Sequence, residues 1–355
     1  MQHRQTVGLV AAGAALALGL AACSSDDAGS SASGGSSGSS DTVTLVTHDS
    51  FAVSPDVLAA FEKQSGLTVK QVAPGDGGAL VNQLVLTKDA PLGDAVYGID
   101  NSYATRATDA GVLDPYVSPD LPASAEDDVV GDSLTPVDRS DVCIDVDKAW
   151  FEKKGVPAPT TLQDLAKPAY RDLLVVTNPA TSSPGLAFLL ATVAAFGEDG
   201  WQDYWTRLKD NGLKVDDGWS DAYYTDFSGS EGKGPRPLVL SYSTSPAETI
   251  SKDGTSSSTA ALLDTCFRQV EYAGVLAGAK NPDGAKQLVD FLVGRQFQED
   301  VPGQMYVYPV DDGAALPDGW EEFAPLSPKP FTVPPDQITE HRDEWIKQWT
   351  ATVIG

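Results

Sequence analysis

The chain has 355 residues, 41% of them hydrophobic, which is enough for one large domain or two smaller ones. Its 50 acidic and 24 basic side chains give a formal net charge of −26. Such a charge repels nucleic-acid phosphates, so the composition argues against direct binding of DNA or RNA, whereas a small cation would be attracted.

The first residues have the order of a targeting segment. Arg4 precedes the apolar run "VGLVAAGAALALGLAA", which is too short to cross a bilayer comfortably. The run ends in "LAAC", and this order resembles the signal of bacterial lipoproteins, in which the cysteine carries the lipid. We therefore expect residues 1–22 to be a removed signal peptide and Cys23 to be lipidated. An ordinary secretory signal is the alternative.

The next segment, "SSDDAGSSASGGSSGSSD", contains only small and acidic residues and cannot form a core. We expect residues 23–41 to be a flexible tether between a membrane anchor and a folded body outside the cytoplasm. Because that compartment is oxidising, Cys143 and Cys266 are expected to pair, with two free buried thiols as the alternative. Only His48 and His341 remain after the signal, so no metal site is predicted.

Strand and helix patterns alternate in the first part of the body. Strands are expected at 41–48, 67–74 and 93–100, with helices at 55–65, from 77 onward and at 103–111. This alternation favours a parallel, doubly wound sheet, in which ligands bind beyond the carboxyl ends of the strands. Asp49, Asp76 and Asp100 follow or end these strands. One such aspartate is ordinarily a helix cap, but three on one rim indicate a ligand site.

A second strand–turn–helix pattern begins at 173–177. Its turn is rich in serine, with Ser182 or Ser183 as the expected N-cap, and it predicts either an anion site or simply a capped helix. The same order recurs at 237–250. A strand at 267–280, an amphipathic helix at 282–301 and a last helix docked by Trp345 and Trp349 complete the body.

Several motifs occur in the order found in one known family. They are "VTHDSFAV", "APGDGGALVNQL", "GDAVYGIDNSYATRA", "NPATSSPGLAFLLA", "DDGWSDAYYTDF", "LVLSYSTSPA", "FRQVEYAGVLAGAK" and "VYPV". Together, from Thr42 to Trp349, they resemble the thiamine-binding subunits of bacterial thiamine ABC importers.

The resemblance implies an α/β, two-lobed periplasmic-binding-protein-like fold of type II, each lobe a mostly parallel sheet flanked by helices. The expected lobes are 42–138 plus 268–310 and 139–267 plus 311–355. The implied function is that of a lipid-anchored receptor outside the cytoplasm. It would bind thiamine or its phosphate esters between the lobes and deliver them to a membrane permease, without a cofactor and without enzymatic activity.

The resemblance also implies a set of binding residues. Thiamine has a cationic thiazolium ring and an aminopyrimidine ring, which call for aromatic faces and a carboxylate. Trp219 and Tyr242 match ring-contacting positions, Asp76 matches the pyrimidine-recognising loop, and Ser182 matches a position near the alcohol or phosphate arm. The full predicted set is His48, Asp49, Asp76, Gly77, Asp100, Ser182, Trp219, Tyr223, Tyr242, Glu248 and Tyr306.

Three residues depart from the family pattern. His48 and Glu248 stand where tyrosine is usual, and Tyr306 stands where tryptophan is usual. If these positions line the cleft, the aromatic cage is thinner and more polar, and Glu248 adds a charge for the thiazolium. A pocket tuned to a related pyrimidine or a phosphate ester is the alternative.

Other functions remain open from the sequence. Tyr223 and Tyr224 are adjacent, as are the phenolate ligands of ferric-ion-binding proteins of the same architecture. A pyrimidine-related enzyme on this fold is a second alternative, although the chain has no GxSxG elbow, and "GSEGKG" lacks P-loop spacing. A structural surface lipoprotein is a third.

Overall fold

The computed structural model describes residues 41–230 and 233–355. The expected signal peptide, the lipidated Cys23 and all but the last residue of the tether lie outside the described residues. Within the described ranges, no helix is both long enough and apolar enough to span a membrane.

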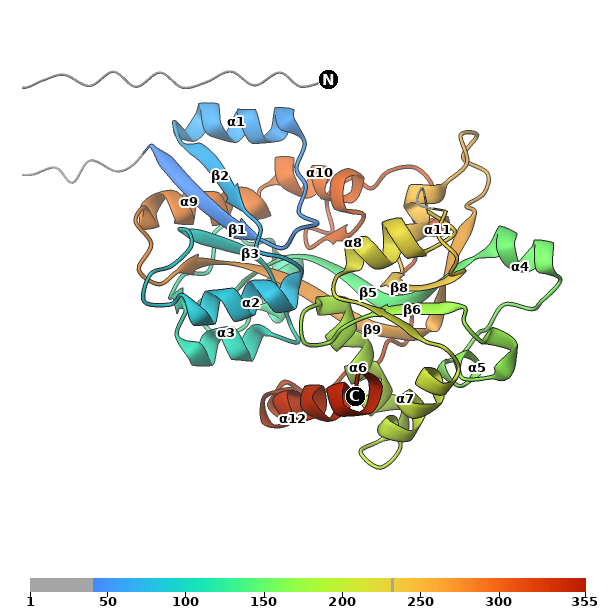
Figure 1. The fold of residues 1–355 in the computed structure, drawn as a ribbon. Helices are drawn as coiled ribbons and strands as arrows, with labels where there is room; N and C mark the ends of the chain where they lie inside the picture. Colours follow the sequence, from blue (N-terminus) through green and yellow to red (C-terminus); the bar gives the residue numbers. More distant parts are fainter. Residues whose placement is uncertain (1–40, 231–232) are drawn as a thin grey trace, which may run out of the picture. The chain divides into compact units, whose positions relative to one another are not determined.

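One mixed sheet runs through the described body, with the strand order β2-β1-β3-β9-β5-β8-β6-β7 (Figure 1). Pairing is parallel at both ends of the sheet and antiparallel in its centre, where β9 and β5 lie. The α/β class is therefore confirmed, with an antiparallel centre that the sequence did not predict. The strands are β1 (Thr42–Thr47), β2 (Thr68–Val72), β3 (Ala95–Asp100), β4 (Leu113–Asp114), β5 (Thr135–Asp147), β6 (Leu174–Thr177), β7 (Lys214–Asp216), β8 (Leu238–Tyr242), β9 (Thr259–Leu276) and β10 (Tyr308–Pro309).

The two central strands, β5 and β9, are long and pair with each other from Thr135↔Ala273 to Asp147↔Thr259. A disulfide between Cys143 and Cys266 joins them, as predicted. The expected lobe boundaries, 138/139 and 267/268, fall inside these strands. Both ends of the sheet are therefore connected through the same two strands.

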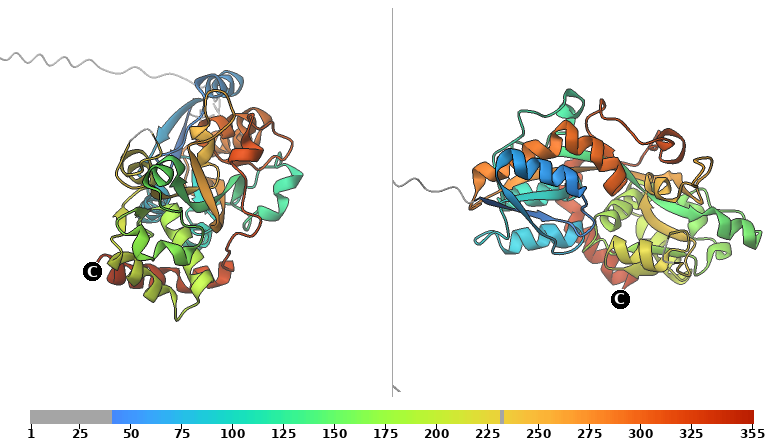
Figure 2. Two further views of the ribbon diagram at one scale, coloured as in Figure 1. Left: turned by 90° about the vertical axis from the view of Figure 1, so that its right-hand side faces the viewer. Right: turned by 90° about the horizontal axis from the view of Figure 1, so that it is seen from above.

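The helices near the N-terminus follow the sequence closely. Helix α1 (Pro55–Ser65) begins with Pro55 in its first turn and ends at Gly66, whose φ of 74° is the left-handed conformation that glycine tolerates. Helices α2 (Gly77–Leu86) and α3 (Ala104–Ala110) also lie where they were predicted. Figure 2 shows α1 beside the later helices α9 and α10, where Phe61 packs on Phe291 at 4.6 Å between ring centroids.

Two predicted helices differ from the structure. The expected helix at 282–301 is broken at Gly294, whose extended backbone separates α9 (Pro282–Val293) from α10 (Arg295–Met305). The helix expected after β8 is only the 3-10 turn η4 (Ser245–Thr249). Gly294 disfavours helical backbone because glycine loses the most conformational freedom in a helix. The five residues of η4 are too few to propagate an α-helix.

Most of the remaining helices follow β5 in the sequence. Helix α6 (Ser183–Phe196) is almost wholly buried. Helix α12 (Pro335–Val353) buries Trp345 and Trp349 and packs against both α7 and α3 (Figure 1). The others are α4 (Lys148–Lys154), α5 (Leu162–Leu165), α7 (Trp201–Asp210), α8 (Trp219–Asp221) and α11 (Trp320–Phe323), the 3-10 turns η1 (Ala123–Asp128) and η2 (Pro168–Tyr170), and the π-helical η3 (Ala222–Asp226).

Candidate functional site

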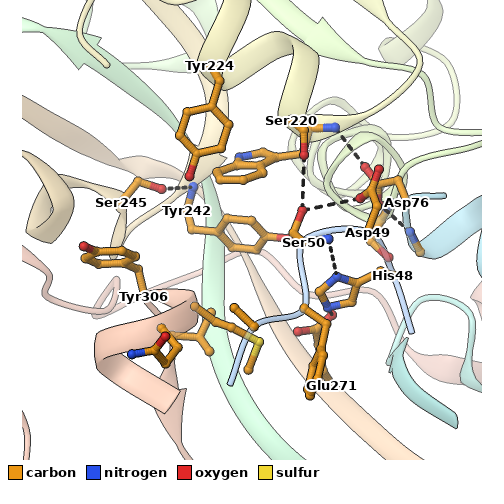
Figure 3. A pocket seen from close by; sticks show the side chains of 18 of the residues that line it. His48, Asp49, Ser50, Asp76, Ser220, Tyr224, Tyr242, Ser245, Glu271 and Tyr306 are labelled. Carbon is orange, nitrogen blue, oxygen red and sulfur yellow. Dashed lines mark hydrogen bonds and ion pairs between the residues drawn. The ribbon is translucent and has the colours of Figure 1, made fainter. Parts of the chain in front are cut away.

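A cavity of about 340 Å³ lies where the carboxyl ends of β1 and β8 meet the starts of α2, α6 and α8 (Figure 3). Eight of the eleven predicted binding residues line it: His48, Asp49, Asp76, Gly77, Trp219, Tyr242, Glu248 and Tyr306. The other lining residues are Ser50, Phe51, Ala52, Ser183, Ser220, Tyr224, Ser245, Glu271, Gln304, Met305 and Val307. Segments from both ends of the sheet therefore contribute to one site.

Trp219 forms an aromatic wall that is supported from behind. Its ring stacks on Tyr223, with centroids 4.8 Å apart and planes inclined by 17°. Its indole Nε1 donates a hydrogen bond to the Ser241 hydroxyl at 2.9 Å. Since Tyr223 is fully buried and does not line the cavity, it positions the tryptophan rather than meeting a ligand.

The adjacent Tyr224 does line the cavity, and its side chain is exposed. Its ring stands edge-on to Trp219, with centroids 5.3 Å apart. Consecutive residues of a helix point in different directions, so Tyr223 faces the core while Tyr224 faces the cavity. Phe227, just beyond η3, is buried in the core.

Asp76 ties together the starts of three helices. Its carboxylate accepts hydrogen bonds from the backbone N–H groups of Gly77 at 2.5 Å, Ser183 at 3.1 Å and Trp219 at 3.0 Å. These groups open α2, α6 and α8. Burial raises the pKa of Asp76, and the hydrogen bonds, the strongest from Trp219, offset part of that rise. One residue thus both lines the cavity and organises its wall.

Asp100 and Ser182 lie behind this wall and do not line the cavity. The Asp100 carboxylate accepts hydrogen bonds from the Ser102 N–H at 2.6 Å and from the Ser183 hydroxyl. Burial raises the pKa of Asp100 to about 6. The Ser182 hydroxyl caps α6 by accepting from the Gly185 N–H at 3.4 Å. Ser183, the other N-cap candidate, is the one that reaches the cavity.

His48 forms an ion pair with Glu271 of β9, with 3.5 Å between Nε2 and Oε1 (Figure 3). Burial alone would lower the pKa of His48, but the carboxylates of Glu271, Asp76 and Asp49 outweigh it and raise that pKa. Burial raises the pKa of Glu271, but His48, together with hydrogen bonds from Asp138 and Tyr97, outweighs burial and lowers that pKa. The positive charge of His48 is thus balanced by the Glu271 carboxylate, which lines the same cavity.

Glu271 also belongs to a buried polar cluster beneath the cavity. The Tyr97 hydroxyl donates to Asp138 and lies 3.3 Å from Glu271. Burial and the nearby charge of Glu271 raise the pKa of Asp138 well above its usual value. Asp138 therefore holds its proton more readily than Glu271, which leaves Glu271 as the ionised partner of His48.

Some of the lining residues outside the predicted set fall into two groups. Ser50 and Ser220 directly follow the predicted Asp49 and Trp219, and Ser183 is the N-cap candidate that follows the predicted Ser182. Glu271 lies inside the 18-residue strand β9, and Gln304 and Met305 are the last two residues of α10, before the predicted Tyr306. No local pattern identifies those positions.

The cavity combines aromatic faces with negative charge. Four carboxylates line it: those of Asp49, Asp76, Glu248 and Glu271. Among the described residues that line it there is no lysine or arginine. Aromatic faces and carboxylates together attract a small organic cation with flat rings.

Comparison with known proteins agrees with this class of site. The family described as bacterial extracellular solute-binding protein matches residues 90–329. The chain therefore belongs to the bacterial extracellular solute-binding proteins. The thiamine-binding periplasmic proteins of Salmonella typhimurium and Brucella suis are 32% and 31% identical to it, over 88% of this chain and 93% and 92% of theirs.

Solved structures show the same fold. A periplasmic thiamin binding protein aligns with a TM-score of 0.77 and 29% identity, covering 88% of this chain and 96% of its own. Iron-bound HitA from Pseudomonas aeruginosa aligns with a TM-score of 0.70 and 21% identity, covering 88% and 99%. At that identity the second likeness concerns the fold alone.

Proposed function

We propose that this chain is a receptor outside the cytoplasm that binds thiamine or one of its phosphate esters in the cavity. The observation that carries the proposal is the supported Trp219 wall beside the Asp76 carboxylate. The similar proteins are named as thiamine-binding, which suggests thiamine as the ligand. The aromatic and acidic lining of the cavity suits such a cation.

The expected binding mode uses each part of the cavity. A thiazolium ring over the face of Trp219 gains about 0.5–2 kcal/mol from the cation–π interaction, and ring stacking adds about 0.5–1.5 kcal/mol. The exocyclic amine of the pyrimidine donates to Asp76. Glu248 and Asp49 add negative charge that attracts the cation.

The wider role follows from the family. Lipidation at Cys23 would anchor the receptor to the membrane through the tether at 23–41. Closure of the proposed lobes, 42–138 plus 268–310 and 139–267 plus 311–355, would enclose the ligand and present it to a membrane permease of an ABC importer. We propose that the chain binds and releases its ligand without chemical turnover.

Ferric-ion binding is a weaker alternative. Of the adjacent tyrosines only Tyr224 lines the cavity, while the Tyr223 ring lies between Trp219 and Phe227. An iron site would need a second phenolate or another hard oxygen ligand from the lining carboxylates.

Isothermal titration calorimetry of purified protein with thiamine tests the proposal, and we expect saturable one-to-one binding. A parallel titration with ferric citrate, followed by visible absorbance, tests the ferric-ion alternative, because tyrosinate–iron complexes absorb visible light. Analysis of the recovered ligand checks for turnover. A protein that shows no calorimetric binding of thiamine but gains a visible absorption band with ferric citrate would be assigned to ferric-ion binding instead.

A further inference from the structure

A second cavity, of about 200 Å³, lies where α2 and α3 meet α12 and the turn before α6. No residue that the structure describes lines both this cavity and the one proposed to bind thiamine. Its polar lining consists of Asn82, Tyr103, Arg106, Arg342 and Asp343. We infer that this second cavity binds a small tetrahedral oxyanion, of the class of phosphate or sulfate, between the two arginines. The inference does not depend on the proposed function.

The walls of this cavity come from elements that are distant in the sequence. Helices α2 and α3 lie against β3, whereas α12 packs on α7 and on α3 (Figure 1). Asn82 Nδ2 donates a hydrogen bond to the Ala180 carbonyl oxygen at 3.3 Å, and the Tyr103 hydroxyl donates to the Pro179 carbonyl oxygen at 2.8 Å. These bonds hold the helices against the turn, so the walls are preorganised and the ordering that binding requires is small.

Arg342 is buried, with 6% of its surface exposed, yet it lines the cavity. Its Nε donates to the Asp343 carboxylate at 3.1 Å, whereas its Nη1 is buried and has no hydrogen-bond partner among the described residues. A guanidinium stays charged in proteins, and a buried charged donor without an acceptor costs free energy. An anionic acceptor in the cavity would therefore stabilise this side chain.

Arg106 approaches the same carboxylate from α3. Its Nη1 lies 3.6 Å from Asp343 Oδ1, the oxygen that also accepts from Arg342. The Nε of Arg106 is buried too and, within the described part of the chain, has no hydrogen-bond partner. Two guanidiniums thus share one carboxylate oxygen, and the lining carries one more positive charge than negative charges. In a chain with a formal net charge of −26, this is a local excess that attracts anions.

Asp343 is the part of the cavity that a ligand can replace. Its side chain is 73% exposed, against 7% for Arg342, so the carboxylate covers the buried guanidinium from the solvent side. An incoming oxyanion would take the place of this carboxylate at Arg342 Nε and Arg106 Nη1, while Asp343 turns into solvent. A tetrahedral oxyanion has further oxygens for the donors that Asp343 leaves unpaired, and hydrogen bonds between guanidinium and phosphate are charge-assisted and strong.

Calorimetric titration of the purified protein with inorganic phosphate tests the inference. At about 0.1 M sodium chloride, where exposed charges are partly screened, we expect saturable binding with a dissociation constant of about 1 mM or below. We expect acetate, which has only two oxygens to share between the guanidiniums, to bind at least ~3-fold more weakly. Acetate that binds as tightly as phosphate would overturn the choice of a tetrahedral ligand. The absence of saturable phosphate binding would overturn the inference and leave the proposed function untouched.

Substitutions in the lining test where the phosphate binds. Arg106→Gln and Arg342→Gln each remove one guanidinium, and we expect each to weaken phosphate binding at least ~10-fold. Asp343→Asn removes the competing carboxylate, and we expect it to tighten binding at least ~3-fold. The matched control is Glu340→Gln, which removes an exposed charge from the same helix outside the cavity. We expect the control to leave the dissociation constant within about twofold of its original value.

The opposite signs expected for these variants keep the test decisive if the buried Arg342 does not tolerate substitution. The side chains of Arg106 and Asp343 are 30% and 73% exposed, so we expect both of these variants to fold. Phosphate binding that is unchanged in Arg106→Gln and in Asp343→Asn would place the phosphate elsewhere on the molecule and overturn the inference.

Discussion

The indole of Trp219 lies nearly parallel to the phenol ring of Tyr223, with 4.8 Å between their centroids. Because Tyr223 is fully buried, this pair fixes one face of the tryptophan against the core and leaves the rest of the ring to the cavity. A rigid aromatic wall loses little conformational freedom when a ligand stacks on it. The pair therefore explains why a buried tyrosine matters for binding without touching the ligand.

Removal of the wall itself should weaken binding strongly. We expect Trp219→Ala to raise the dissociation constant for thiamine more than about tenfold, since both stacking and cation–π attraction are lost. The control is Trp349→Ala, which removes a ring buried in the core on α12. We expect that variant to lower the melting temperature while leaving the calorimetric affinity of the folded protein nearly unchanged. Equal effects of the two variants on affinity would contradict the site.

Tyr223 is expected to act through Trp219. Tyr223→Phe keeps the ring, so we expect near-normal affinity and stability. Tyr223→Ala removes a buried aromatic side chain, which typically costs about 3–5 kcal/mol of unfolding free energy. It also removes the ring on which the Trp219 indole stacks, so we expect weaker binding of thiamine. Urea denaturation and thiamine titration of both variants measure the two effects. If the folded Tyr223→Ala variant binds thiamine with unchanged affinity, Trp219 does not need the Tyr223 ring to bind the ligand.

The pairing of His48 with Glu271 predicts a pH-dependent contribution to stability. The folded-state pKa of His48 is raised above 6.5, with Glu271, Asp76 and Asp49 facing the ring. The stabilisation is therefore fully present below that value and is lost as the pH rises through the raised pKa. We expect the difference in unfolding free energy between the unmodified protein and His48→Gln to be larger at about pH 6 than at about pH 9.

Urea denaturation at both pH values measures this difference. In a Glu271→Gln background we expect the trend to shrink, because the carboxylate that contributes most to raising the pKa of His48 is gone. A difference that does not change with pH would contradict a charged His48–Glu271 pair.

The disulfide between Cys143 and Cys266 closes a long loop, with a sequence separation of 123. Disulfides stabilise typically by about 2–4 kcal/mol, and more for longer loops. We expect reduction by a phosphine to lower the unfolding free energy by this amount. The double variant Cys143→Ala/Cys266→Ala should be equally destabilised and insensitive to the reductant, which separates loss of the bond from other effects of reduction.

Much of the site could be predicted because its residues follow strand ends or open helices. Asp49 follows β1, and Asp76 precedes α2, where its side chain accepts from the N–H of Gly77. Helix α1 was placed to the residue for a related reason, since proline marks its start and glycine its end.

The remainder depends on tertiary structure. Glu271 reaches the cavity because β9 crosses between both ends of the sheet, and a strand sequence does not reveal its neighbours. Adjacent helical residues point in different directions, and which of Tyr223 and Tyr224 faces the cavity depends on how η3 packs against the core. Asp100 ends β3, but it lies behind the cavity wall, where it accepts a hydrogen bond from the Ser183 hydroxyl.

The two central strands have a mechanical consequence. Walls of the cavity from both ends of the sheet are connected through β5 and β9, and these strands hold each other along nearly their whole length and through one covalent bond. Widening the cavity therefore requires elastic bending of a paired ribbon rather than free rotation about a loop. We therefore expect the range of openings of the cavity to be limited by how far these two paired strands can bend.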